Sequence, residues 1–200
     1  MDDSAIGSVP LFAALDDDAR VALREAMDEV SLRRGETLFH EGEPGDRLYL
    51  VLEGKVKLGH RSADGRENLL AILGPGELLG ELTLFDPGTR TATATAVAST
   101  RLLELQHDPF MHLVDTRPEL AKHMLRALAQ RLRRTNEALA DLVFSDVPGR
   151  VAKALLDLSE RFGEQTPDGL RVAHDLTQEE LAQLVGASRE TVNKALADFA

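Results

Sequence analysis

The segment from Gly80 to Thr91 contains residue types that bind a phosphate group and a sugar. Gly80 allows a ligand to approach the backbone closely, and the residues after it can form a short helical turn whose free N–H groups attract an anion. Arg90 offers two donors to a phosphate, Thr91 a hydroxyl, and Glu81 a carboxylate that can accept from a ribose hydroxyl. Singly, these residues are also typical of helix caps, surface ion pairs and turns. Their combination predicts a phosphate-and-ribose site.

The stretch from Gln178 to Ala197 has the pattern of a helix-turn-helix. Apolar and small residues occur where two short crossed helices must touch, and Gly186 lies where the turn needs a positive φ. Arginine can donate two hydrogen bonds to guanine and glutamate can accept one from cytosine, so the second helix is suited to reading base edges. An ordinary α-hairpin is the alternative, and we favour DNA binding. The second helix, expected to begin at Ser188, would present outward Arg189, Glu190, Asn193 and Lys194.

Composition limits the classes of function. The chain has 200 residues, of which 43% are hydrophobic and 28% charged, as in an ordinary globular protein. It has no cysteine, which excludes disulfides and cysteine-ligated metal sensors. Neither a secretion signal nor a membrane-spanning run is evident, so we expect a cytoplasmic protein with no membrane partner.

The charge is unusual for a protein that binds DNA. The formal net charge is −11, and acidic residues outnumber basic ones even between Asp146 and Ala200. Because neutralisation of phosphates supplies most non-specific affinity for DNA, this charge lowers the expected affinity. It favours a regulated binder over a constitutive one.

The sequence does not favour an enzyme. Its histidines are scattered without the spacing of a metal-binding motif, and no serine or lysine lies in a nucleophile motif. We therefore predict no catalytic residues and no metal. A jelly-roll metal enzyme with an appended helical domain is the alternative from a different class. The histidines are His40, His60, His107, His112, His123 and His174.

The elements that would position the phosphate-and-ribose site are short strands. After an acidic helix from Asp16 to Glu29, β-prone runs alternate with glycine-bearing turns as far as about His107. Such strands predict an antiparallel sandwich or jelly roll, a shell that commonly encloses one small ligand. The clearest runs are Leu48–Leu52, Val56–Gly59, Leu69–Leu73 and Ala92–Ala98.

A long helix is expected to follow Pro118 and to carry a row of leucines. The row has the spacing of a coiled-coil seam, with Thr135 at the position where a leucine is missing. A seam needs a partner helix, most simply that of a second subunit, so we expect a homodimer. Thr135 either sets the register of the seam or meets a ligand at the dimer interface. The leucines are Leu125, Leu128, Leu132, Leu139 and Leu142.

A hinge is predicted at Phe144–Gly149, which contains a cap residue, a proline and a glycine. A helix at Arg150–Phe162, a turn at Thr166–Gly169 and a strand at Leu170–Ala173 would then lead into the helix-turn-helix. The predicted domains are a ligand-binding β-roll at 1–117, a dimerisation helix at 118–145 and a DNA-binding domain at 146–200.

In its order of motifs the chain resembles the cyclic AMP receptor protein (Crp/Fnr) family over nearly its whole length. The shared motifs are Gly-Glu-Leu-x₇-Arg-Thr, Arg-Arg-Thr-Asn at 133–136, the Asp-Val-Pro-Gly-Arg hinge and the Gly-Ala-Ser-Arg-Glu-Thr-Val recognition helix. Residues 65–70 and 139–142 are most similar to the actinobacterial members. The resemblance implies an α+β fold: an N-terminal β-roll of jelly-roll type, a long dimerisation helix, and a C-terminal winged helix-turn-helix domain that here lacks its last hairpin.

This resemblance implies a transcription regulator with cyclic AMP as its allosteric effector. The homodimer would bind palindromic double-stranded DNA with TGTGA-like half-sites and would contact RNA polymerase. The adenine would reach Thr135 of its own subunit and Asn136 of the partner. The other implied cyclic AMP residues are Gly80, Glu81, Leu82, Arg90 and Thr91. The implied DNA-binding residues are Thr177, Gln178, Ser188, Arg189, Glu190, Thr191 and Lys194.

Two positions depart from the enterobacterial pattern of the family. Asn136 replaces a serine, which changes the group offered to the base, and Lys194 replaces an arginine. Because lysine is a point charge and not a planar fork, discrimination at that base would be softer. A regulator of the same architecture with another effector, or with none, is the alternative. A cyclic-nucleotide-binding module without a DNA function is disfavoured by the complete helix-turn-helix.

The end of the sequence carries one more expectation. Ala200 falls at the end of the recognition helix with no capping glycine or asparagine, and the strand at Leu170–Ala173 has no evident later partner. Similar proteins continue into a β-hairpin wing. We therefore expect weak, salt-sensitive DNA binding and a frayed last helix, with cyclic AMP binding and dimerisation retained.

Overall fold

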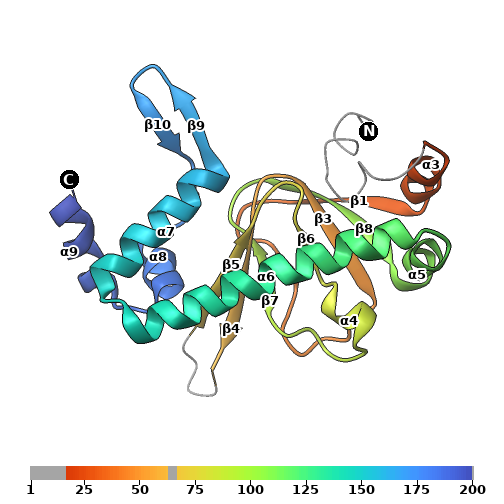
Figure 1. Cartoon of the computed structure of the whole chain (residues 1–200), viewed down its shortest axis with the longest axis horizontal. Coiled ribbons are helices and arrows are strands. Elements are labelled where there is room, and N and C mark those ends of the chain that lie inside the picture. Colours follow the sequence, from red (N-terminus) through yellow and green to blue (C-terminus); the bar gives the residue numbers. More distant parts are fainter. Residues whose placement is uncertain (1–16, 63–66, 200) are drawn as a thin grey trace. The chain divides into compact units, whose positions relative to one another are not determined.

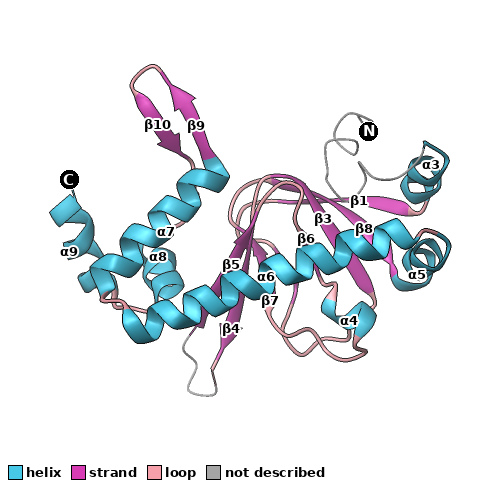
Figure 2. Ribbon diagram, in the orientation of Figure 1, coloured by secondary structure: helices cyan, strands magenta, loops and turns pink. Residues whose placement is uncertain are grey.

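The computed structural model describes residues 17–62 and 67–199, and its N-terminal part contains two four-stranded sheets (Figures 1 and 2). The strand pairs β1·β8, β3·β8, β3·β6 and β2·β7 are antiparallel, as in the expected sandwich. One sheet has the order β1 (Met27–Leu32), β8 (Thr100–Gln106), β3 (Arg47–Glu53), β6 (Leu78–Leu79). The other has the order β2 (Thr37–Phe39), β7 (Thr93–Ala96), β4 (Val56–Arg61), β5 (Glu67–Leu73).

The helix before the sheets is shorter than predicted. α3 spans Asp17–Glu25, and residues 27–29, which we expected to be helical, belong to β1; Asp16 lies outside the described residues. β1 pairs with β8 in an unbroken register, from Met27 opposite Leu105 to Leu32 opposite Thr100. Strand formation depends strongly on the neighbouring strand, so this pairing outweighs the local helical pattern.

Strand β3 in the sheet β1-β8-β3-β6 is buried on both faces: Leu48 to Val51 are all buried, and successive side chains of a strand point to opposite sides. In β3, Leu48 and Leu50 join a cluster with Phe110 of α5 (His107–Thr116) and Met124 of α6 (Pro118–Phe144). Tyr49, which lies between them, joins a second cluster that draws residues from both sheets. The second cluster includes residues that line the candidate ligand site.

α6 begins at Pro118 and has 27 residues. Leu120 and Met124 near its start are buried in the first core cluster. Four of the five leucines of the predicted seam are more than half exposed, and Leu128 is partly buried. An exposed apolar row on a helix needs a partner surface. The exposed leucines are Leu125, Leu132, Leu139 and Leu142.

Beyond α6, a helix and a hairpin precede the helix-turn-helix. α7 (Val147–Phe162) is capped by Asp146, whose side chain accepts from the Gly149 N–H. β9 (Gly163–Thr166) and β10 (Gly169–Val172) pair as an antiparallel hairpin. The predicted strand at Leu170–Ala173 thus has a partner that precedes it, and our interpretation of it as unpaired was wrong. β9 is polar and only half-buried, so no alternation of apolar residues indicated it.

The helix-turn-helix consists of α8 (Gln178–Val185) and α9 (Arg189–Phe199). Gly186 between them has φ 63°, as the turn was predicted to require. Seven residues were expected where the two helices touch. Ala187 is half-buried and Gly186 is exposed, whereas the other five are buried: Leu181, Ala182, Val185, Val192 and Ala195.

The described chain divides into two compact units. One contains the residues up to Leu58 and Ile72–Arg131, and the other contains Gly59–Ala71 and the residues from Leu132 onward. The domain limits at 117/118 and 145/146 stay predictions. None of the helices in the two described ranges is long and apolar enough to cross a membrane.

Candidate ligand site and DNA-binding face

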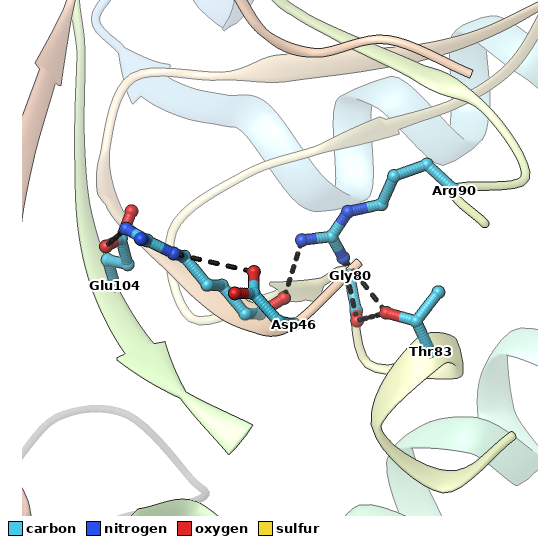
Figure 3. A network of polar contacts seen from close by, with 6 residues as sticks. Asp46, Gly80, Thr83, Arg90 and Glu104 are labelled. Atoms are coloured by element: carbon cyan, nitrogen blue, oxygen red, sulfur yellow. Dashed lines mark hydrogen bonds and ion pairs between the residues drawn. The ribbon is translucent and has the colours of Figure 1, made fainter. Parts of the chain in front are cut away.

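Gly80 and Arg90 form the centre of the candidate ligand site (Figure 3). Arg90 Nη1 donates to the Gly80 carbonyl at 3.1 Å and to Thr83 Oγ1 at 3.2 Å, and Nη2 donates to the Arg47 carbonyl at 2.9 Å. Gly80 has φ 82°, and a Cβ added there would lie 2.4 Å from Arg90 Nη1. Glycine is therefore required at this position, because a side chain would displace the guanidinium.

The segment that carries the Arg47 carbonyl is itself held in place. The Arg47 side chain forms an ion pair with Glu104 of β8, and Asp46 Oδ1 lies 3.5 Å from Arg47 Nε (Figure 3). The Glu104 carboxylate raises the pKa of Arg47, first through its charge and then through the hydrogen bond. The acceptor for Arg90 is thus anchored to the sheet.

Arg90 keeps donors for a ligand. A guanidinium has five N–H groups. The three hydrogen bonds above use three of them, and Nε is buried without a partner among the described residues. The acceptors are uncharged carbonyl and hydroxyl oxygens, so they do not neutralise the cation. Arg90 is 4% exposed, and burial lowers its pKa, although an arginine remains protonated at physiological pH. A buried cation with unused donors is suited to an anion such as a phosphate.

Glu81 provides the second polar group of the site. It precedes α4 (Leu82–Phe85), the short helical turn that the sequence predicted after Gly80, and it is 2% exposed. Its Oε1 forms an ion pair with Arg131 of α6, while its Oε2 is buried with no hydrogen-bond partner among the described residues. A buried acceptor without a donor is costly, so a ligand hydroxyl at Oε2 would stabilise the site.

These residues surround a pocket of about 40 Å³. This is room for water, whereas sites for small organic ligands have several hundred Å³. Thr135 and Asn136 are exposed residues of α6 and are not among the residues that line the pocket. The predicted ligand residues that do line it are Gly80, Glu81, Leu82, Arg90 and Thr91.

Arg131 and Phe39 also line the pocket, although the sequence pattern did not indicate them. Arg131 lies four residues before Thr135, and residues at this spacing share one face of a helix. That spacing was a usable signal for Arg131. Phe39 has no such signal, because its neighbours in the pocket are distant in sequence.

The exposed surface of α9 carries most of the predicted base-reading side chains. Asn193 is the exception: it is half-buried and its Oδ1 is buried without a hydrogen-bond partner in the described ranges, so its predicted outward position was wrong. It directly follows the buried Val192 and precedes the half-buried Leu196 by three residues, which places it at the edge of the buried face. The exposed side chains are Arg189, Glu190, Thr191 and Lys194.

Both helices of the motif begin with a side-chain cap. Thr177 Oγ1 accepts from the Glu180 N–H at 3.1 Å, and Glu180 Oε2 accepts from the Thr177 N–H at 2.8 Å. Ser188 Oγ accepts from the Thr191 N–H at 3.2 Å. Gln178, the first residue of α8, is exposed. The caps satisfy backbone N–H groups in the first turns of α8 and α9 and so fix where the two helices begin.

A β-roll with a buried arginine that keeps unused donors, followed by a helix-turn-helix, is the arrangement expected of a ligand-responsive DNA-binding regulator. Comparison with known families supports this class. The cyclic nucleotide-binding domain matches residues 29–117, and the Crp-like helix-turn-helix domain matches residues 149–200.

Individual relatives cover most of the chain. A CRP-like cAMP-activated global transcriptional regulator of Mycobacterium tuberculosis is 56% identical over 198 residues, which span 99% of this chain and 88% of that protein. The solved N-terminal domain of a transcriptional regulator from Streptomyces coelicolor A3(2) is 59% identical, with TM-score 0.53 over 71% of this chain and 98% of that one. The Thermus thermophilus catabolite activator protein is 37% identical, with TM-score 0.59 over 95% and 86%. The chain therefore belongs to the Crp/Fnr family of transcription regulators, among its actinobacterial cyclic AMP receptor-like members, and it is not an enzyme.

Proposed function

We propose that cyclic AMP is the effector of this regulator and that it binds in the pocket around Gly80 and Arg90. The observation that carries the proposal is the pairing of two unused groups in one pocket: the spare N–H donors of Arg90 and the unpaired Oε2 of Glu81. A cyclic phosphate would bind the first, and a ribose 2′-hydroxyl would donate to the second. The M. tuberculosis relative is named as cAMP-activated, which agrees with this assignment.

Binding must open the pocket, because about 40 Å³ does not hold a nucleotide. Glu81 connects α4 to Arg131 of α6 through its ion pair. A ligand hydroxyl on Oε2 would bind the same carboxylate that holds Arg131 through Oε1, so ligand binding and the position of α6 would be coupled. The ligand's higher affinity for one arrangement of α6 is the source of the allosteric effect, typically about 1–3 kcal/mol. We assign Thr135 and Asn136, farther along α6, to contacts with the adenine in the dimer.

On DNA, we propose a homodimer that binds palindromic TGTGA-like half-sites and contacts RNA polymerase. The exposed leucines of α6 supply a seam for the dimer, and α9 exposes Arg189, Glu190 and Lys194. Two such helices would enter successive major grooves about 34 Å apart. Because chromosomal DNA is the target, we place the action of the protein in the cytoplasm.

The test combines two titrations of the full chain. Calorimetry with cyclic AMP and cyclic GMP measures whether and which nucleotide binds, and fluorescence anisotropy measures affinity for a palindromic duplex with and without that nucleotide. We expect cyclic AMP to bind and to strengthen binding to the palindrome more than to a scrambled duplex of the same length. Failure of cyclic AMP to bind, or an unchanged DNA affinity on binding, would favour a regulator with another effector or none.

A further inference from the structure

The guanidinium of Arg90 rests on two aromatic rings. Its Cζ lies 4.3 Å from the centroid of the Phe39 ring and 5.8 Å from that of the Tyr49 ring. The two ring centroids are 5.9 Å apart, and the ring planes are tilted by 32°. Phe39 comes from β2 and Tyr49 from β3, so the two sheets each contribute one ring. We call Phe39 and Tyr49 the aromatic platform.

The platform stabilises the cation without using its N–H groups. The face of an aromatic ring attracts a cation through its quadrupole, and the attraction is stronger when both are desolvated. Phe39 is 8% exposed, Tyr49 6% and Arg90 4%, so this contact is shielded from water. A carboxylate in the same place would occupy the donors that a phosphate needs. The rings leave Nε and one further N–H of Arg90 unused.

The ionisation of Tyr49 suits this role. Burial raises the pKa of Tyr49 to about 12, with the charge of Glu104 acting in the same direction. The ring therefore stays neutral throughout the physiological range. Its contact with Arg90 does not become an ion pair that would compete with an anionic ligand.

We propose that Phe39 and Tyr49 are positioning residues for anion binding: they hold the plane of Arg90 so that its unused donors remain available to a phosphate in the pocket. This proposal adds two residues to the proposed cyclic AMP site, and it rests on the proposed function for the identity of the anion. If the two rings only filled the core, leucine at position 39 would serve almost as well, since apart from Tyr49 the cluster around Phe39 is aliphatic.

The first measurement needs no ligand. The Arg90 Nε–H signal in a ¹H–¹⁵N spectrum of the full chain is identified by its loss in Arg90→Lys. We expect this signal to be shifted upfield by the ring current of Phe39, and to move toward the range of other arginines in Phe39→Leu. Phe110→Leu is the matched control, because Phe110 is equally a buried ring of this unit but meets Phe85 edge-on and not Arg90. In that variant the signal should stay in place.

The second measurement is the affinity for cyclic AMP by calorimetry. Loss of a shielded cation–π contact predicts roughly tenfold weaker binding in Phe39→Leu. Phe110→Leu should bind within about twofold of the parent. Tyr49→Phe keeps the ring and should bind like the parent, whereas Tyr49→Leu should bind several-fold more weakly.

The two measurements distinguish a failure of the aromatic-platform proposal from a failure of the proposal that cyclic AMP is the effector. Parent-like affinity in Phe39→Leu overturns the proposal, as does an equal loss in Phe39→Leu and Phe110→Leu with an unmoved Arg90 signal. If the parent does not bind cyclic AMP, the proposed effector is wrong, and the Arg90 signal alone decides on the platform. A signal that moves in Phe39→Leu then supports it, and one that does not move refutes it.

Discussion

At the scale of residues, two buried charged groups decide what the pocket can bind. Arg90 has unused donors and Glu81 has an unused acceptor, although both are more than nine-tenths buried. Groups of this kind are destabilised until a partner of the opposite hydrogen-bonding character arrives. We therefore expect the pocket to favour a ligand that offers both an anion and a hydroxyl.

Glu81→Gln is expected to weaken discrimination at the ribose. The amide keeps the volume of the side chain but loses the ion pair with Arg131 and the charged acceptor. We expect roughly tenfold weaker binding of cyclic AMP, by loss of a charge-assisted hydrogen bond. Competition with 2′-deoxy cyclic AMP measures the preference for the 2′-hydroxyl, which should shrink in the variant. Glu53→Gln, on the exposed end of β3, is the control, and an unchanged preference in Glu81→Gln would contradict the role of Oε2.

At the scale of elements, the junction of α6 and α7 is held by hydrogen bonds from one side chain, Arg150. Arg150 Nη1 donates to the Ser145 carbonyl at 2.7 Å, and Nε donates to the Val185 carbonyl at 2.8 Å. Its Nη2 donates to the Gly186 carbonyl at 3.3 Å. One arginine thus ties the end of α6 to the turn of the helix-turn-helix. The break between the two helices lies inside the predicted hinge at Phe144–Gly149 but is shorter, because α7 begins at Val147, after its cap Asp146, and not at the predicted Arg150. This break is connected to α8.

Gly186→Ala should destabilise this junction. Residue 186 has φ 63°, and an added Cβ would lie 2.9 Å from Leu142 Cδ2. The left-handed conformation alone costs a non-glycine residue about 1–2 kcal/mol. Thermal unfolding followed by circular dichroism should show a lower Tm. Gly88→Ala, where the added Cβ would meet only the Asp86 carbonyl at 3.8 Å, should leave Tm nearly unchanged. Equal Tm values in both variants would show that the turn tolerates a side chain.

Lys153→Met should change how the junction responds to acid. The hydrogen bond from Lys153 lowers the pKa of Asp141, and the hydrogen bond from Ser145 acts in the same direction. A lowered pKa in the folded state gives stability that is present above the unfolded-state pKa and is lost as the pH falls through the folded-state pKa. In Lys153→Met the pKa of Asp141 should rise and this acid-sensitive contribution should shrink. Side-chain carboxyl NMR measures the titration, with Lys122→Met as the remote control; identical Asp141 curves would exclude the coupling.

At the scale of the whole molecule, the net charge of −11 and the exposed leucine row together indicate that DNA binding depends on dimerisation. The charge repels DNA unless cations are presented together in the right geometry. Pairing two copies through α6 would double the recognition helices, which compensates for few cations per chain. Dimerisation is therefore expected to be a condition of specific DNA binding.

Leu139→Glu tests this expectation. Leu139 is 61% exposed in the leucine row, and a charge at a seam position opposes pairing. We expect sedimentation to show a monomer and anisotropy to show loss of binding to the palindromic duplex. Ala138→Glu introduces the same charge at the neighbouring exposed position off the row, and it should remain dimeric. A dimeric Leu139→Glu would place the interface elsewhere.

The sequence by itself determined what depends on a few consecutive residues. The turn at Gly186 and the short helix after Gly80 depend on backbone preferences of a few residues, and the leucine row on the regular spacing of side chains along one helix. The Arg90 segment was indicated by residue types that lie close together in the sequence. Only the tertiary structure decided that Met27–Leu32 is a strand, that β9 pairs with β10, and that Asn193 is half-buried. It also brought Arg131 to Glu81 and both aromatic rings to Arg90. The contacts of β1 with β8, of Arg131 with Glu81 and of the rings with Arg90 join residues tens of positions apart, and their geometry follows from sheet register and packing, which no local pattern specifies. β9 lies next to β10 in the sequence, but its polar residues gave no strand pattern.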